Sequence, residues 1–223
     1  MTTSIARHER ATFREKTLRE AGAKLVSALD RESIYQATLD AALELVEGTP
    51  EVRVGLARGS EEGMTVVASA GYRAAEIRGD RFYVHTLPEP LRDRLLQKQP
   101  VEVEHPESSD LRKALGLASR VRPFFVTPLL IGGELRGVMG VTSASALSEE
   151  IKEGLVALGS QVSLALESNT LAEEAQKRKS EEHFRSLVQN ASDVIMITGA
   201  DGTLNYISPA VERVLGYKPE DIV

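Results

Sequence analysis

A long stretch without proline runs from Ser148 to about Gln189. A proline inside a helix removes a backbone hydrogen bond and breaks or kinks the helix, so this absence allows one continuous helix. Ser148 opens the segment, and the carboxylates of Glu149 and Glu150 suit the positive end of a helix dipole. The sequence therefore predicts a long helix over residues 148–190.

One face of this predicted helix carries residues at alternating steps of four and three, the a/d spacing of a coiled coil. These residues are Ile151, Leu155, Leu158, Val162, Ala165, Asn169 and Ala172. Such a face either pairs with a second copy of the chain or packs on the sheet of its own domain. Past Ala172 the same positions turn polar (Gln176 and Lys179), which favours a connector surrounded by solvent. We predict a homodimer through the N-terminal and long helices, with an interface at Leu18, Leu25, Ile151, Leu155, Leu158, Val162, Ala165 and Asn169.

Two pairs of alternating segments predict antiparallel hairpins. The runs "EVRVGLAR" (51–58) and "MTVVASA" (64–70) flank a short turn, and the first places Val52, Val54 and Leu56 on one face. The runs on either side of Gly132-Gly133 in "RPFFVTPLLIGGELRGVMGVTSA" are strongly β-prone, and the double glycine supplies the positive φ angles of a tight turn. Together they indicate a central antiparallel sheet.

Helices are predicted before the first hairpin and between the two. Residues 5–29 lack proline and repeat apolar residues at helical spacing, and Asp30 is placed to cap a second helix that stops at Gly48. Residues 71–120 form a long excursion, with short helices predicted at 91–98 and 110–119 and a strand at "VEVE". Excursions of this length usually serve a site.

The order of these elements resembles that of a GAF domain. Members of this family have a strand ending in a Pro-Leu pair, a turn, and then Gly-Val followed by apolar residues, and Pro128, Leu129, Gly137 and Val138 match this pattern. The resemblance covers about residues 18–168. It implies an α+β fold with a central antiparallel sheet, flanked by N-terminal helices and a long C-terminal signalling helix.

The C-terminal residues 180–223 resemble the start of a PAS domain. They contain a lead-in helix, a predicted strand from Asp193 to Thr198, an Asp201-Gly202 turn, a second strand and a helix capped by Ser208 with Pro209 first inside it. Gly216 suits the left-handed position that ends this helix. A PAS module needs roughly 100 residues, so we expect an excerpt of a longer protein whose residues 193–223 are poorly ordered or borrow partners from another chain.

The two resemblances give an expected domain organisation. Residues 1–29 are a helix for dimerisation and signalling, residues 18–168 a GAF domain, residues 148–190 a connector helix and residues 180–223 an incomplete PAS domain. By resemblance, a GAF domain followed by a PAS domain most often precedes a diguanylate cyclase or a histidine kinase in bacterial multidomain signalling proteins. The expected function is therefore a sensor module that regulates such an effector, most often one that makes cyclic-di-GMP.

GAF domains include cyclic-nucleotide receptors, bilin photoreceptors, haem or iron sensors and a methionine sulfoxide reductase. The chain has no cysteine, which excludes a covalently attached bilin and a thiol reductase. The Asn-Lys…Phe…Asp-Glu signature of the cyclic-nucleotide subgroup is missing between residues 20 and 168. His85 and His105 lack a neighbouring His or Cys at ligand spacing, so surface histidines are favoured over metal or haem ligands. The cofactor stays unknown.

Arginine and aromatic residues gather in and beside the excursion, where the resemblance places the ligand pocket. The candidate pocket residues are Tyr72, Arg73, Arg78, Arg81, Phe82, Tyr83, Arg122 and Phe124. Guanidinium forks suit carboxylates and phosphates, which favours an anionic small ligand. The alternative is that the arginines are solvated on the surface and the aromatic rings pack in the core.

The net charge of −6 disfavours nucleic acid and membrane surfaces as partners, because both attract clustered Lys and Arg. No apolar leader and no apolar run of about 18 residues is present, so we expect a cytoplasmic protein without a membrane span.

A Walker-type phosphate loop, Gly-x-Ser-x-Gly and His-Glu-x-x-His are all missing, so this segment is not expected to be an enzyme. A different class of function also stays open: a dimerisation scaffold that binds no ligand.

Overall fold

The computed structural model describes the chain except residues 1, 104–121, 191–192 and 223. It divides into two compact units, Met1–Asn169 and Thr170–Val223. The helix predicted at residues 110–119 lies outside the described residues.

The first unit is built on an antiparallel sheet of six strands in the order β3-β2-β1-β6-β5-β4. The strands are β1 (Arg53–Ser60), β2 (Gly63–Gly71), β3 (Arg81–Phe82), β4 (Val101–Val103), β5 (Phe124–Ile131) and β6 (Glu134–Thr142). Gly132 and Gly133 take positive φ angles of 60° and 76° in the turn between β5 and β6. Both predicted hairpins and the central antiparallel sheet are confirmed.

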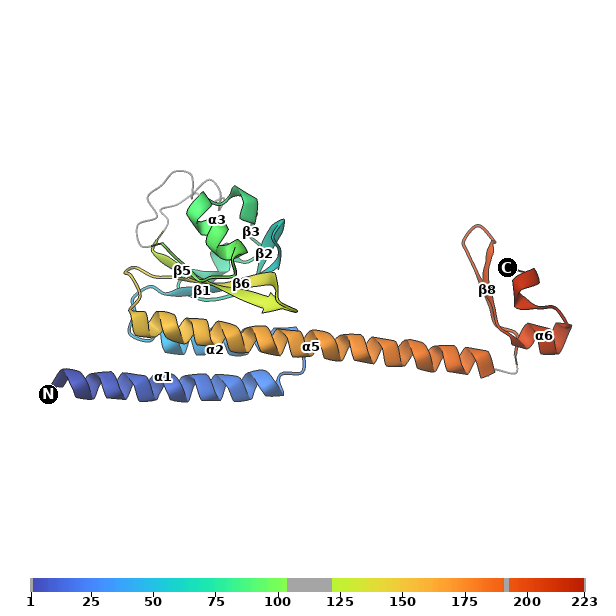
Figure 1. Ribbon diagram of the computed structural model, residues 1–223, viewed down its shortest axis with the longest axis horizontal. Coiled ribbons are helices and arrows are strands. Elements are labelled where there is room, and N and C mark those ends of the chain that lie inside the picture. Colours follow the sequence, from blue (N-terminus) through green and yellow to red (C-terminus); the bar gives the residue numbers. More distant parts are fainter. Residues whose placement is uncertain (1, 104–121, 191–192, 223) are drawn as a thin grey trace. The chain divides into compact units, whose positions relative to one another are not determined.

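One face of this sheet is covered by α2 (Arg31–Leu45) and the part of α5 (Glu149–Asn190) up to Asn169, and α1 (Thr2–Ser27) packs on the far side of these two helices; short helices cover the other face (Figure 1). The opposite face carries η1 (Ala74–Ile77), η2 (Val84–Thr86) and α3 (Glu89–Leu96). The predicted cap of α2 is confirmed, because the Asp30 carboxylate accepts a hydrogen bond from the Ser33 backbone N–H at 2.8 Å.

Each face of the sheet has its own hydrophobic core. The core on the helical side joins the sheet to α1, α2 and α5 and includes Leu25, Ile34, Val54, Leu56, Phe125, Met139, Leu155, Leu158 and Val162. The core on the other side lies under η2 and α3 and includes Met64, Val84, Leu87, Leu95, Val101, Leu135 and Val138. Successive side chains of β1 point to opposite faces of the sheet, which explains why its apolar residues alternate in the sequence.

Helix α5 is continuous from Glu149 to Asn190, as its lack of proline predicts. Its a/d face, however, packs on the sheet of its own domain. Leu155, Leu158 and Val162 are 0% exposed within the single chain, so assigning these three to a dimer interface is wrong in this structure. An a/d spacing cannot distinguish the two cases, because both require one continuous apolar stripe along a helix.

The other predicted interface positions are also engaged within the chain. Leu25 is buried in the same core, and Leu18, Ile151 and Ala165 are partly buried against it. The Asn169 side-chain amide donates to the Leu29 carbonyl oxygen at 3.5 Å. These positions therefore have contacts within the chain that do not require a second copy.

The second unit contains the C-terminal part of α5, the hairpin of β7 (Met196–Thr198) and β8 (Leu204–Ile207), then α6 (Ala210–Leu215) and η3 (Pro219–Asp221). The Asp201-Gly202 turn is confirmed, since the Asp201 carboxylate accepts from the Thr203 N–H at 3.1 Å and Gly202 has a φ of 82°. Gly216 ends α6 with a φ of 79°. The first strand begins at Met196 rather than at the predicted Asp193.

Ser208 does not cap α6 with its side chain, in contrast to the prediction. Its hydroxyl is buried, accepts a hydrogen bond from the Ile195 N–H at 3.0 Å and donates one to the Asp193 carbonyl at 3.4 Å. The hydroxyl thus ties the start of α6 to the residues before β7. Pro209 occupies the N-cap position of α6 instead.

Within residues 2–103, 122–190 and 193–222, none of the helices combines the length and the apolar character that crossing a membrane requires.

Candidate functional site

Four strand ends meet at one end of the sheet in the first unit. Arg53, the first residue of β1, pairs in register with Gly71 at the end of β2 and with Thr142 at the end of β6, and Thr142 pairs with Phe124 at the start of β5. Tyr72, Arg73 and Arg122 directly adjoin these strand ends. We call Arg53, Arg73 and Arg122 the arginine cluster.

Two members of the arginine cluster have acidic partners. Arg122 forms an ion pair with Glu51, and its guanidinium lies over the ring of Tyr72, 4.9 Å from the ring centroid. A guanidinium over an aromatic ring is attracted by the negative face of the ring, which is a cation–π interaction. The Nε of Arg73 lies 2.8 Å from the Glu76 carboxylate. These groups are partly exposed and form the rim of the site.

Arg53 is the innermost member of the cluster and is half-buried. Its Nε is buried and has no hydrogen-bond partner among the described residues. Burial is the main cause that lowers the pKa of Arg53, and the charges of Arg122 and Arg73 lower it further, whereas the carboxylates of Glu76 and Asp80 raise it. The positive charge of Arg53 is therefore partly buried beside two other cations, and its Nε has no hydrogen-bond acceptor among the described residues.

The backbone at the rim is strained at two positions. Glu51 and Arg73 have φ angles of 54° and 50°, in the left-handed region that residues other than glycine rarely adopt. Strained residues of this kind gather at binding and catalytic sites. Here they hold the acidic partner of Arg122 and one of the three cluster arginines.

The sheet surface beside the cluster lacks side chains at two adjacent positions, Gly55 in β1 and Gly140 in β6, which pair in register. A methyl group added at Gly55 would lie 3.0 Å from Ile77 of η1, so this position is covered. A methyl group added at Gly140 would meet only the Gly55 carbonyl, at 4.0 Å, among the described residues. No described residue therefore covers Gly140 on the outer face of the sheet.

The structure places four of the predicted pocket residues, Tyr72, Arg73, Arg122 and Phe124, at or beside these strand ends, and of these the first three carry the polar contacts of the site. Phe82 is partly buried against the second core and Phe124 is buried at the start of β5, so both pack as core residues. The remaining three, Arg78, Arg81 and Tyr83, are exposed. The eight predicted pocket residues do not include Arg53, so the sequence prediction missed the central residue of the arginine cluster.

The sequence did hold one signal for Arg53. In "EVRVGLAR" the residues Val52, Val54 and Leu56 share the face toward the helices, so Arg53 must lie on the opposite face of β1. An arginine on the face that also carries a hydrophobic core is unusual, because charged side chains are rarely buried unless paired.

A small cavity of about 10 Å³ lies near the start of β5 and is lined by Glu102, Val103, Pro123, Phe124, Phe125, Ser143, Ala146 and Leu147. This volume suits about one water molecule, so the cavity is too small for a ligand. Among the described residues, no three His, Asp or Glu side chains are grouped to hold a metal ion. His85 is exposed and lies 5.6 Å from Tyr83, measured between ring centroids, whereas His105 and Arg120 lie outside the described residues.

The first turn of α5 is bonded to two other elements. The amino group of Lys152, a residue only 8% exposed, lies 2.7 Å from the Glu102 carboxylate in β4 and also pairs with Glu149. The hydrogen bond to Glu102 is the main cause that raises the pKa of Lys152, and the hydrogen bond to Glu149 is the second. β4 immediately precedes residues 104–121, so Lys152 joins the sheet edge beside the predicted excursion to α5.

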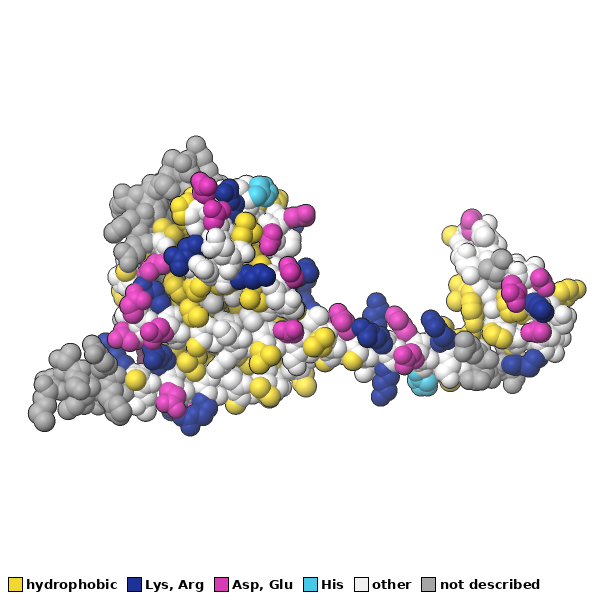
Figure 2. Space-filling model, in the orientation of Figure 1, with side chains coloured by type: hydrophobic (Ala, Val, Ile, Leu, Met, Phe, Trp, Pro, Cys, Tyr) yellow, Lys and Arg dark blue, Asp and Glu magenta, His cyan; other side chains and the backbone are white. Residues whose placement is uncertain are grey.

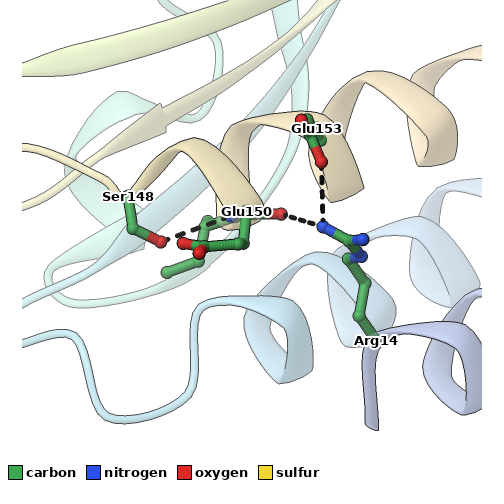
Figure 3. A network of polar contacts seen from close by, with 5 residues as sticks. Arg14, Ser148, Glu150 and Glu153 are labelled. Carbon is green, nitrogen blue, oxygen red and sulfur yellow. Dashed lines mark hydrogen bonds and ion pairs between the residues drawn. The ribbon is translucent and has the colours of Figure 1, made fainter. Parts of the chain in front are cut away.

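Helix α1 contacts the same turn through Arg14 (Figure 3). The Arg14 guanidinium donates to the Glu150 carbonyl oxygen at 3.0 Å and to the Glu153 carboxylate at 3.1 Å. The Ser148 hydroxyl accepts from the Ile151 N–H at 3.4 Å and so caps α5. A displacement of β4 or of α1 therefore acts on the start of α5.

Comparison with protein families gives two matches. The GAF domain family matches residues 28–167. The PAS fold family matches residues 182–223. No curated protein sequence matches the chain.

Several solved structures are similar to this chain. The phycocyanobilin-bound GAF domain of a cyanobacterial phytochrome is 19% identical with a TM-score of 0.55, over 71% of this chain and 96% of that one. The Stigmatella aurantiaca phytochrome photosensory core module is 17% identical with a TM-score of 0.60, over 79% of this chain and 40% of that one. The GAF domain of an Acinetobacter phosphoenolpyruvate-protein phosphotransferase is 19% identical with a TM-score of 0.54, over 67% and 90%. At these identities the likeness shows the fold.

Proposed function

Because the chain belongs to the GAF domain family, we propose that its regulatory sensor function works by binding a small ligand on the outer face of the sheet and passing the signal into α5. The observation that carries this proposal is the double attachment of the first turn of α5, to Glu102 of β4 through Lys152 and to α1 through Arg14. A ligand that moves the sheet edge acts on the helix through these bonds.

The mechanism requires two packings of α1 and α5 that differ in ligand affinity. A ligand shifts a conformational equilibrium only by its difference in affinity for the two states. The ligand's contacts lie on the outer face, beside Gly140 and the arginine cluster, while α1 and α5 lie on the inner face. The six-stranded sheet and the bond from Lys152 to Glu102 link the two faces.

The experiment is hydrogen exchange of the backbone amides of α1 and α5, measured with and without candidate small acids and nucleotides. We expect a ligand that binds the first unit to change exchange in the first turns of α5. The Lys152→Met variant keeps a long side chain but loses the bond to Glu102, so it is expected to bind the same ligand without the change in α5. Binding that leaves exchange in α5 unaltered in the unmodified protein contradicts the proposed transmission.

We further propose that the effector is a diguanylate cyclase, with a sensor histidine kinase as the alternative. The support is the pairing of a GAF domain with a match to the PAS fold in one chain, which is an association and involves no effector residue. The test is to measure cyclic-di-GMP synthesis and autophosphorylation by the natural full-length protein. Either activity changing with the Lys152→Met substitution supports regulation by this segment.

We also propose that two copies of the chain pair through the exposed side of α1 and α5. Figure 2 shows hydrophobic side chains exposed on the helical side of the first unit. They include Phe13, Val26, Leu29 and Leu164, of which the last three are 89%, 93% and 69% exposed. The buried a/d face cannot serve this purpose. Sedimentation of a Leu164→Lys variant tests the interface, with Glu62→Lys, at an exposed position of the turn between β1 and β2, as its control.

The alternative function, a dimerisation scaffold that binds no ligand, has two observations in its favour. Ile77 covers Gly55, and the cavity beside Phe124 holds about one water molecule. A scaffold predicts dimerisation without a response to any small molecule. The same hydrogen-exchange experiment separates the two functions, because only a sensor changes its exchange on addition of a ligand.

A further inference from the structure

We propose that the arginine cluster binds the carboxylate or phosphate group of a small ligand, and that Arg53 is the residue on which the binding depends. That the bound ligand is the signal which the protein senses rests on the proposed function. Binding of its anionic group by the arginine cluster does not.

The topology of the sheet explains why the cluster exists. The three arginines are far apart in sequence and come together because β1, β2, β5 and β6 end or begin at the same place. Arg53 projects from the face of β1 opposite the helical core, between the last residues of β2 and β6. Arg73 and Arg122 flank it from the segments after β2 and before β5.

The hydrogen-bonding state of Arg53 indicates an unfilled acceptor position. A buried donor without a partner costs free energy, so such groups are rare and call for an explanation. The buried Nε of Arg53 lacks a partner among the described residues, whereas Arg73 and Arg122 each pair with an acid. An oxyanion beside Arg53 supplies the missing acceptor, and its negative charge offsets the burial and the repulsion that lower the pKa of Arg53.

The acids near the cluster leave Arg53 without a direct partner. The carboxylates of Glu76 and Glu51 pair directly with Arg73 and Arg122, and that of Asp80, an exposed residue, acts on Arg53 only through its charge. Elsewhere on the visible face of the first unit, dark-blue and magenta side chains are interspersed (Figure 2). The carboxylates of Glu51 and Glu76 are about half exposed, so they can turn toward solvent when a ligand arrives.

Arginine is the residue type that this role requires. A guanidinium presents its N–H donors in a planar fork that matches the oxygens of a carboxylate or a phosphate. The guanidinium of Arg122 lies over the Tyr72 ring, and this contact restrains its position before a ligand binds. Glu51, the present partner of Arg122, then acts as an internal competitor for the ligand.

The experiment measures binding of inorganic phosphate and of citrate to the full chain, by calorimetry and by the shift in melting temperature, with sodium chloride at equal ionic strength as the reference. We expect saturable binding of at least one of the two probes. The Arg53→Gln variant is expected to bind about tenfold or more weakly, because a neutral amide lacks both the charge and the fork. Arg58→Gln, on an exposed arginine of the same strand, is the matched control and is expected to bind like the unmodified protein.

A second variant keeps the test decisive if Arg53→Gln fails to fold. Glu51→Gln preserves the shape of the side chain but removes the competing charge, so it is expected to bind the probe several-fold more tightly. Failure of both probes to bind saturably, or equal affinities in the unmodified protein and in both Arg53→Gln and Glu51→Gln, would overturn the proposal. Anion binding without a change in hydrogen exchange of α5 would support this inference while contradicting the proposed signalling function.

Discussion

Gly159 of α5 lies directly against Thr127 of β5, and a methyl group added to the glycine would come within 2.3 Å of the threonine Cγ2 methyl. Helix α5 approaches the sheet here more closely than any side chain on residue 159 allows. The neighbouring Ser163 hydroxyl accepts a hydrogen bond from the Leu130 N–H at 3.0 Å, which fixes the same helix to the same strand. The position of α5 on the sheet is thus set by a glycine.

We predict that Gly159→Ala lowers the stability of the first unit. An alanine inside a helix normally gains about 1 kcal/mol over glycine, but overpacking against a buried strand costs about 1–3 kcal/mol. Because the contact is with a short side chain on the backbone of β5, the clash is expected to win by about 1 kcal/mol. Denaturant unfolding measures the change in the free energy of unfolding.

Two variants identify the cause. Gly22→Ala in α1 meets Gln161 at an ordinary 3.4 Å, so it is expected to leave stability unchanged or raise it. Adding Thr127→Ser to Gly159→Ala removes the clashing methyl and is expected to recover most of the lost stability. A Gly159→Ala protein as stable as the Gly22→Ala protein contradicts the close-approach explanation.

The next prediction concerns the pH dependence that Lys152 gives to the first unit. Its pKa in the folded state is raised above the ordinary value of 10.5 by hydrogen bonds to Glu102 and Glu149. A raised folded-state pKa contributes stability that is fully present below the unfolded value and is lost as the pH rises through the folded value. We therefore expect Lys152→Met to destabilise the unit by about 1–2 kcal/mol near neutral pH and to flatten its loss of stability above about pH 10.

The measurement is a series of melting temperatures between neutral and alkaline pH for the unmodified protein and the variant. Lys24→Met, on an exposed lysine of α1, is the matched control. Two parallel curves for Lys152→Met and the unmodified protein across the alkaline range contradict a contribution from this amino group.

In the second unit, Ser208→Ala tests the hydrogen bonds that replace the predicted cap. The substitution leaves the partly buried Ile195 N–H without its acceptor, which costs up to about 1–3 kcal/mol. We expect faster amide exchange at Ile195 and along the β7–β8 hairpin, with exchange in the first unit unaltered. Exchange at Ile195 that is the same in both proteins contradicts the assignment of this bond. Ser180→Ala, at an exposed position of α5, is the control.

The contrast between Ser208 and Asp30 shows which features a sequence predicts. Asp30 caps α2 through Ser33, three residues away, so all the information is local. The Ser208 hydroxyl bonds instead to Ile195 and Asp193, thirteen and fifteen positions earlier, and its position depends on how the hairpin folds back. Hairpin turns and the extent of α5 were predictable for the same reason as the Asp30 cap.

The candidate site was only partly predictable because it depends on long-range pairing. Tyr72, Arg73 and Arg122 were predicted because arginine and aromatic residues gather in and beside the excursion. Arg53 was missed, because its place in the site follows from the register of β1 with β2 and β6. The pattern within β1 gives the face on which Arg53 lies. It does not give the other strand ends that meet there.

The last prediction separates the buried stripe of α5 from its exposed side. Leu155→Lys places a charge at a position that is 0% exposed in the core, and an uncompensated buried charge costs several kcal/mol or forces the structure open. We therefore expect this variant to unfold, with loss of the cooperative melting transition in circular dichroism. Leu164→Lys, nine residues along the same helix and 69% exposed, is expected to melt like the unmodified protein and to differ only in sedimentation. A folded, monomeric Leu155→Lys protein would instead restore the a/d stripe as the dimer interface, because its partner surface would then lie outside the chain's own core.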